Sequence, residues 1–364
     1  MVLIFIIISG LDCKLPFAKE KQSDFPSMEE YRKGTGALAI DFGGLIKEVP
    51  ENNPFQIPVE VRNEGASDIK EAYVFINTGE YADALESEDF VKIDVKEAIT
   101  KEFSFVGRSP ENPDGQREIV FLNAQALSAG TEDSVSSEIK ATACFDYKTI
   151  AKADVCIDTE KYKPGRFGAR ACEVKDISMQ SQGAPLAVTK IKTDILYVDK
   201  DHIKPYFEIT VENKGNGDVF KLDSGQSVKN SCLGSIGKNY NKAVVEASLT
   251  GEEKKLKCSM GQEAKEAYFK EGESIVTCQG DPIPTDKPAF LTPLYIEVYY
   301  GYVLTESANV KIKNIRVGEC MIDFPFGSKC NDLPGTKCDA PDFTKEPIET
   351  RDCAWGCCEF VGGR

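Results

Sequence analysis

The stretch FQIPVEVRNEGASDI, residues 55 to 69, alternates apolar and polar side chains and then turns. One face of an extended chain would carry all of its apolar residues, which is the pattern of a strand buried on one side. The Asn-x-Gly that begins at Asn63 is typical of a turn, because asparagine and glycine tolerate positive φ. Pro58 has no amide hydrogen, so we expect an edge strand or a bulge there. The residues of the apolar face are Phe55, Ile57, Val59 and Val61.

This pattern belongs to an internal repeat. FEITVENKGNGDV (207 to 219) repeats it, ALAIDF (37 to 42) is matched by PLAVTK (185 to 190), and ATACFDYKTIAKADVCI (141 to 157) is matched by IEVYYGYVLTESANVKI (296 to 312). The three matches occur in the same order, at offsets of 148, 150 and 155 residues. Three matches in register indicate a duplicated domain.

Short alternating strands separated by Gly, Pro and Asn predict an all-β protein of two tandem immunoglobulin-like β-sandwiches with a small disulfide-rich C-terminal module. Helical patterns are limited to two short candidates, residues 27 to 33 and 262 to 270. The predicted organisation is a signal-like or anchor segment (1–13), an N-terminal linker (14–34), a first sandwich (35–158), a linker (159–171), a second sandwich (172–318) and the Cys-rich module (319–364).

The strand, the Asn-x-Gly and the next strand in VEVRNEGASDIKEAYVFI (59 to 76) resemble the immunoglobulin-like modules of prokaryotic, in particular archaeal, cell-surface proteins of the CARDB-like type. The resemblance covers two short stretches in each repeat. It implies an extracellular spacer or adhesive module, and it brings no catalytic residues.

The charge and cysteine content indicate an exported protein. The net charge of −15 disfavours nucleic acid as a partner. Thirteen cysteines suit an oxidising compartment. The apolar run VLIFIIISG (2 to 10) resembles the core of a signal peptide and is shorter than the roughly 20 residues that span a bilayer. Cys13, in SGLDC, is a candidate lipid anchor and the only expected link to a membrane; a truncated or misassigned start is the alternative.

In the stretch ACFDYKTIAKADVC, Cys144 and Cys156 are an even number of residues apart, so an extended chain would carry both on the same face. With a turn near Ile150, the two thiols would face each other across a hairpin at a distance that a disulfide accepts. In the second repeat Tyr299 and Lys311 hold these places, so the bridge is expected to be a local staple. A zinc site is disfavoured, because it needs two further ligands nearby.

The other cysteines form two even sets. Cys172, Cys232, Cys258 and Cys278 permit three connectivities, of which Cys258–Cys278 with Cys172–Cys232 is preferred. Three disulfides are expected to stabilise the tail, with a metal knuckle as the alternative. Trp355 is either an exposed binding aromatic or the miniature core of that tail. The tail cysteines are Cys320, Cys330, Cys338, Cys353, Cys357 and Cys358.

No catalytic constellation appears in the sequence, so we expect a protein that is not an enzyme. The only histidine, His202, lies in a charged loop, which leaves Ser–His and Cys–His systems without a base. No cofactor is expected. Acidic loops at 85 to 90, 112 to 115 and 198 to 201 are weak candidates for calcium, since none has the spacing of a calcium-binding loop.

These observations predict an extracellular or cell-surface protein with a binding or structural role of the adhesion type. Expected partners are proteins or glycans of the cell envelope. Two alternatives remain: a self-associating subunit of a surface assembly, and a hydrolase that uses paired carboxylates.

Overall fold

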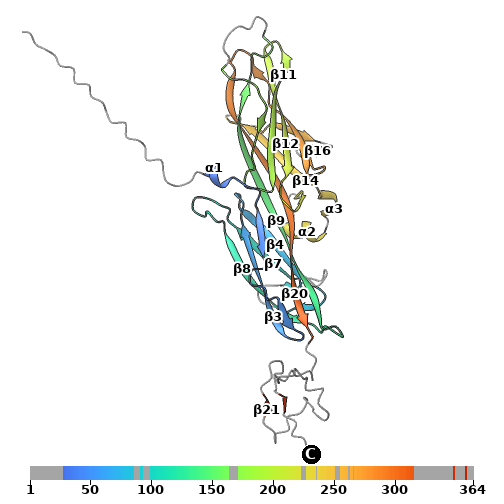
Figure 1. Ribbon diagram of the computed structural model, residues 1–364. Coiled ribbons are helices and arrows are strands. Elements are labelled where there is room, and N and C mark those ends of the chain that lie inside the picture. Colours follow the sequence, from blue (N-terminus) through green and yellow to red (C-terminus); the bar gives the residue numbers. More distant parts are fainter. Residues whose placement is uncertain are drawn as a thin grey trace, which may run out of the picture.

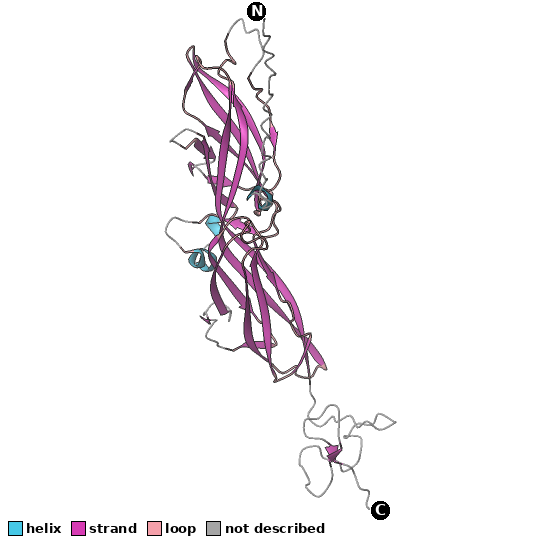
Figure 2. Cartoon of the chain, turned by 90° about the vertical axis from the view of Figure 1, so that its left-hand side faces the viewer, coloured by secondary structure: helices cyan, strands magenta, loops and turns pink. Residues whose placement is uncertain are grey.

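The protein is all-β, as predicted, and it contains disulfides. The computed structural model describes residues 28–85, 91–92, 99–163, 171–222, 227–234, 236–250, 255–260, 263–264, 266–314, 347–348 and 357–358. The helices within these residues are α1 (Met28–Tyr31), α2 (Val228–Gly234) and α3 (Ile236–Asn239). Figure 1 shows the strands arranged in an elongated body, and Figure 2 shows them running along its long axis.

A nine-stranded central sheet runs through both repeats in the order β17-β14-β20-β9-β4-β7-β6, and β13 and β2 pair with β20 outside this path. All its pairings are antiparallel except that of β2 with β20. The strands are β17 (Glu266–Tyr268), β14 (Lys242–Leu249), β20 (Phe290–Lys313), β9 (Ser134–Ile157), β4 (Ile69–Asn77), β7 (Ile99–Phe105), β6 (Val91–Lys92), β13 (Asp218–Phe220) and β2 (Glu48–Pro50).

The two 24-residue strands β9 and β20 form a ribbon that joins the repeats (Figure 1). They pair over their whole length, and Asp146 faces Gly301 at the middle. These two residues are 155 positions apart, the same offset as Tyr147 and Tyr302. Equivalent positions therefore meet around a pseudo-twofold axis. The repeats share one sheet, whereas the sequence predicted two sandwiches in tandem; the predicted domain boundaries stay predictions.

The predicted turn near Ile150 is wrong, because β9 continues through it. The segment Lys148–Lys152 contains no Gly, Pro or Asn that would permit a reversal, and the apolar alternation continues unbroken beyond it. Ala151 and Val155 are both buried. The predicted alternation is present, but it belongs to one long strand.

Two outer sheets cover the same face of the central sheet. Every second residue of β9 from Ile139 to Val155 is buried, as is every second residue of β20 from Leu294 to Leu304, so both repeats have their core on one side. The first outer sheet, in the order β1-β3-β8-β5, consists of β1 (Leu38–Asp41), β3 (Pro54–Asn63), β8 (Arg117–Ala126) and β5 (Ala82–Ala84).

The second outer sheet has the order β10-β11-β12-β18-β15-β16, and β19 pairs with β12. It lies against the half of the central sheet that carries β14 and β17. A separate short pairing joins β21 (Pro347–Ile348) and β22 (Cys357–Cys358). The strands of the second outer sheet are β10 (Ile177–Ser178), β11 (Leu186–Asp199), β12 (His202–Asn213), β18 (Glu273–Gln279), β15 (Lys257–Met260), β16 (Glu263–Ala264) and β19 (Ile283–Pro284).

The strand predicted from residues 55 to 61 is confirmed, and its apolar face is buried. It is not an edge strand, because β3 lies between β1 and β8. Pro58 nevertheless sits where no donor is needed. The last β1 residue, Asp41, pairs with Glu60, so β1 ends before it reaches Pro58.

The Asn-x-Gly turns form a corner in each repeat. In the first repeat the Asn63 side chain accepts a hydrogen bond from Gly65 N (3.1 Å) and donates to Ser67 O (2.8 Å). Ser67 N donates to the hydroxyl of Tyr147 at 3.2 Å. A residue from the end of the repeat thereby holds the turn near its beginning.

The second repeat makes the same contacts. The Asn213 side chain bonds Gly215 N (3.2 Å) and Gly217 O (2.9 Å), and Gly217 N donates to the hydroxyl of Tyr302 at 2.8 Å. The rings of Phe145, Tyr147, Tyr300 and Tyr302 pack together around the pseudo-twofold axis, with neighbouring centroids 5.8 to 6.2 Å apart.

The repeats differ by an insertion. Where the first repeat has the continuous strand β4, the second has β13 and β14, separated by a segment that contains α2 and α3. This segment covers the middle of the outer face of the central sheet, the face away from the outer sheets. The short helix predicted at 27 to 33 is confirmed as α1, whereas the one predicted at 262 to 270 is wrong, since β16 and β17 lie there. The small core under the insertion consists of Tyr73, Cys144, Phe220 and Val228.

Candidate binding surface

The described part of the chain contains the disulfides Cys144–Cys232, Cys156–Cys172 and Cys258–Cys278. The predicted pair Cys258–Cys278 is confirmed, and the two residues face each other in neighbouring strands. The predicted pairs Cys144–Cys156 and Cys172–Cys232 are wrong.

The first error follows from the missing turn. Cys144 and Cys156 do share the outer face of β9, as predicted, but they lie twelve residues apart on one strand, or roughly 40 Å at 3.3 Å per residue. Each therefore pairs with a residue from elsewhere. Cys144 ties the insertion of the second repeat to a strand of the first, and Cys156 ties the end of β9 to the segment that leads to β10.

The predicted lipid anchor Cys13 and the predicted aromatic Trp355 lie outside the described residues. So do Cys320, Cys330, Cys338 and Cys353. Cys357 and Cys358 are described only as the strand β22.

Exposed tyrosines mark the outer face of the central sheet. Tyr295 and Tyr299 alternate with Glu297 on β20 and keep 38% and 36% of their surface exposed. Across the ribbon, Tyr295 faces Lys152 and Tyr299 faces Lys148. We call this surface the tyrosine face; it consists of Lys148, Ile150, Lys152, Glu246, Lys255, Tyr295, Glu297 and Tyr299.

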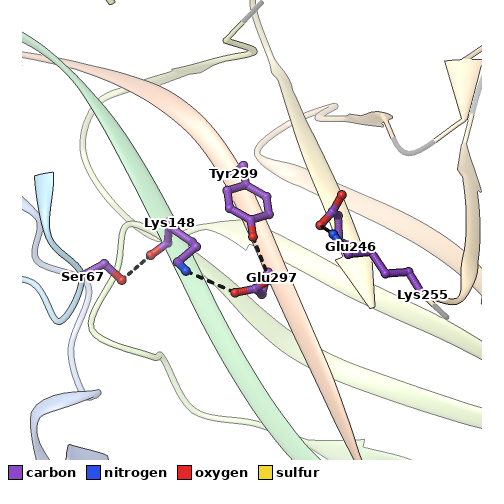
Figure 3. Close-up of polar contacts among 6 residues, drawn as sticks. All are labelled: Ser67, Lys148, Glu246, Lys255, Glu297 and Tyr299. Atoms are coloured by element: carbon purple, nitrogen blue, oxygen red, sulfur yellow. Dashed lines mark hydrogen bonds and ion pairs between the residues drawn. The ribbon is translucent and has the colours of Figure 1, made fainter. Parts of the chain in front are cut away.

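Polar contacts orient the side chains of this face (Figure 3). Glu297 accepts hydrogen bonds from the Tyr299 hydroxyl at 2.7 Å and from Lys148 Nζ at 3.2 Å. The Lys148 ammonium also lies 5.7 Å from the centroid of the Tyr299 ring, and Lys152 lies at the same distance from Tyr295. Each ring thus has a cation beside it, which favours a defined orientation.

Glu297 carries a shifted pKa. Burial opposes its ionisation, but the hydrogen bonds from Tyr299 and Lys148 outweigh this effect, so the pKa lies below its usual value of 4.5. Burial and the bond to Glu297 raise the pKa of Tyr299. At neutral pH the face therefore presents a carboxylate, a neutral phenol and ammonium groups, a mixture of donors and acceptors around aromatic rings.

We expect the Tyr299→Phe variant to raise the pKa of Glu297, because the carboxylate loses a donor that favours its charged form. Since the folded-state pKa is lowered, the ionised carboxylate stabilises the fold above pH 4.5, and this contribution is lost as the pH falls through the folded-state value. A carboxyl-carbon NMR titration would measure the shift. Tyr197→Phe, on the opposite outer sheet, is the control, and equal Glu297 pKa values in both variants would contradict the assignment.

Two hollows flank the tyrosines. One, of about 250 Å³, lies between Tyr295, Glu246 and Ile150, and the other, of about 370 Å³, lies between Tyr299, Lys148 and Ser67. Ile150 lines both, so the two hollows are neighbours on the ribbon. Strand alternation in YIEVY (295 to 299) could have located this surface in the sequence, but only with knowledge of which face lies inward.

His202 and the acidic loops at 112 to 115 and 198 to 201 lie elsewhere, and residues 86 to 90 of the remaining candidate loop lie outside the described residues. His202 Nδ1 is 3.0 Å from Asp199 Oδ1, and Asp199 also accepts a hydrogen bond from Asp201 N at 2.8 Å. Within the described residues, no Ser or Cys side chain bonds to His202, and no three His, Cys, Asp or Glu side chains gather as metal ligands would. None of the described helices has the length and apolar character needed to span a membrane.

No family model and no curated protein matches the chain. Among solved structures, the human F-spondin reeler domain is similar at 12% identity over 32% of this chain and 82% of that chain, with a TM-score of 0.18. The secreted serine protease VesC from Vibrio cholerae has 10% identity, coverages of 78% and 53% and a TM-score of 0.19. A DUF4466 family protein from Parabacteroides merdae has 9% identity, coverages of 68% and 99% and a TM-score of 0.14. Similarities this weak carry no argument about function.

Proposed function

We propose that the protein is an exported, non-catalytic binding protein of the cell surface, and that the tyrosine face is its ligand-binding surface. Three disulfides among the described residues support an oxidising compartment. An adhesive role of the CARDB-like type is in keeping with two repeats built into one elongated body.

The observation that carries the proposal is the pair of exposed tyrosines beside fixed polar groups. A tyrosine ring offers an apolar face for stacking, and its hydroxyl remains available for hydrogen bonds. The CH-rich faces of sugars stack on such rings, and sugar hydroxyls pair with carboxylates and ammonium groups like those of Glu297 and Lys148. We therefore assign envelope glycans as the ligand class.

The spacing of the tyrosines favours an oligosaccharide. Tyr295 and Tyr299 are four residues apart on one strand, which places them about 14 Å apart at 3.4 Å per residue. A single sugar cannot contact both rings, whereas a short chain lying along the ribbon can. The hollow beside each ring gives such a chain room for one of its sugars.

A glycan array followed by calorimetry tests the proposal. We expect binding of at least one oligosaccharide, and a loss of affinity of about tenfold or more in the Tyr295→Ala/Tyr299→Ala variant, because the stacking surface is removed. Tyr197→Ala is the matched control, since Tyr197 is 59% exposed but lies on the second outer sheet. Unchanged affinity in the double variant would contradict the assigned surface, and release of new reducing ends during incubation would contradict a non-catalytic role.

A further inference from the structure

A second surface, unrelated to the tyrosine face, lies along the free edge of the first outer sheet. Residues 35–40, which include most of β1, form one wall of a groove of about 320 Å³, and Leu304 and Glu306 of β20 line it as well. We call it the edge groove. Among the described strands, β1 pairs only with β3, so its other side is open to an additional strand.

The backbone groups that point into the edge groove can be identified from the pairing. Glu64 N donates to Ala37 O at 2.7 Å, so odd-numbered residues of this strand turn toward β3. The amide and carbonyl groups of Leu38 and Ile40 consequently point outward. Within the residues that the structure describes, neither residue has a hydrogen bond on that side.

In the second repeat the equivalent edge is fully capped. Leu186, which corresponds to Leu38, donates its amide to the Tyr300 hydroxyl at 3.3 Å, and its carbonyl accepts from Thr149 Oγ1 at 2.8 Å. The side-chain amide of Gln182 bonds both the amide of Val188 (2.9 Å) and its carbonyl (3.0 Å).

The cap continues as an added strand. Met179 N donates to Thr189 O at 2.8 Å, and β10 then pairs with Lys190 and Ile191 of β11. The chain that immediately precedes β11 therefore lies along the free edge of β11. The fold of the second repeat thus accommodates an additional strand at the position that corresponds to the edge groove.

The first repeat has no equivalent of the two capping hydroxyls. Phe145 stands at the position of Tyr300 and Leu304 at the position of Thr149, both at the offset of 155 residues, so neither can bond the edge. The residues that precede β1 are held elsewhere: Gly34 O accepts from Gly183 N at 2.9 Å, and Arg108 donates to Lys33 O at 2.8 Å. Within the part of the chain that the structure describes, the edge groove therefore has no strand like that of its counterpart.

We propose that residues 14–27 of the chain occupy the edge groove as an extended strand. They are the next segment upstream of α1, as the capping segment of the second repeat is upstream of β11. Fourteen residues extend over about 45 Å, which exceeds the length of the groove wall. Leu15 and Phe17 are two positions apart and so share one side of a strand, where they would face the apolar floor at Leu304.

Charge complementarity supports this occupant. The carboxylate of Glu306 lines the groove and has no ion pair among the described residues. Residues 14–27 carry Lys14, Lys19 and Lys21 against Glu20 and Asp24, whereas the chain as a whole is strongly acidic. Lys214 and Glu64 also line the groove, but each has an ion-pair partner. The net positive charge of the segment therefore suits the carboxylate of Glu306.

Amide hydrogen exchange on the full chain tests the proposal. We expect the amides of Leu38 and Ile40 to exchange at least tenfold more slowly in the unaltered chain than in a Leu15→Ser/Phe17→Ser variant, because the added strand protects them. Leu291→Ser is the control and should leave their exchange unchanged, because Leu291 is 62% exposed and does not line the groove. The amides of Leu186 and Val188 should stay protected throughout, which verifies that the variants are folded.

A synthetic peptide of residues 14–27 provides the second measurement. Added to the double variant, it should restore protection of Leu38 and Ile40, and Glu306→Gln should weaken that effect several-fold. Protection supports the proposal whether the strand comes from the same copy or another. Equal exchange in the unaltered chain and the double variant overturns it: fast exchange in both means that the groove is empty, and slow exchange in both means that another strand fills it.

Discussion

The Gly301→Ala variant is expected to lose about 2–3 kcal/mol of unfolding free energy, the upper part of the range for an overpacked core. An added Cβ would lie 2.2, 2.3 and 2.6 Å from three carbons of the Phe220 ring. That ring is fully buried under the insertion and cannot swing away. Because Gly301 faces Asp146 at the centre of the ribbon, any backbone shift that relieved the contact would disturb both repeats.

Urea unfolding measures this effect, with Gly237→Ala as the control. No heavy atom lies within 4 Å of the Cβ that an alanine would add at Gly237, so that substitution should be near neutral or slightly stabilising. A Gly301→Ala/Phe220→Leu variant should cost less than the sum of its single changes, because the smaller side chain makes room for the new methyl group. Equal urea midpoints of unfolding for Gly301→Ala and Gly237→Ala would contradict the close contact between the added Cβ and the Phe220 ring.

Removing the bridge between the repeats is expected to have the largest effect among the disulfides. Cys144 and Cys232 are separated by 88 residues, and Cys258 and Cys278 by 20. In the chain-entropy account, a loop of the first size is worth about 4–5 kcal/mol and one of the second size about 3 kcal/mol. The Cys144→Ala/Cys232→Ala variant should therefore lose roughly 1 kcal/mol more than Cys258→Ala/Cys278→Ala.

Chemical unfolding of the two double variants under oxidising conditions compares these losses directly. The Cys144–Cys232 bridge also holds the insertion over Phe220. Without this bridge, the small core under the insertion should become exposed and bind a hydrophobic dye before global unfolding. If the Cys258→Ala/Cys278→Ala variant were instead the less stable of the two, the bridge between the repeats would contribute little beyond local geometry.

Local patterns in the sequence predicted much of the secondary structure. The alternation at 55 to 61, the Asn-x-Gly corners and the Cys258–Cys278 pair are all short-range features, and the structure confirms each of them. The order of the three repeated stretches also indicated that Tyr147 and Tyr302 are equivalent, and both close the corner of their own repeat.

The shared sheet could not be predicted in the same way. Its key contact joins Asp146 and Gly301, which are far apart in sequence and differ in chemistry, so no local pattern links them. The false hairpin in β9 arose because alternation determines which face a residue lies on but not where a strand ends. The tyrosine face was missed for a related reason: exposed aromatics on β20 are recognisable only once the buried face is known.

The ladder of β9 with β20 has a consequence for the history of the chain. Cut between the repeats, each half would keep a 24-residue strand that has lost its longest pairing partner, and half of the aromatic cluster would face solvent. Neither half is a self-sufficient building block, so the pieces would have to reassociate to fold. Equivalent residues that meet across a twofold axis are the arrangement that duplication and fusion of the gene of a symmetric dimer would produce.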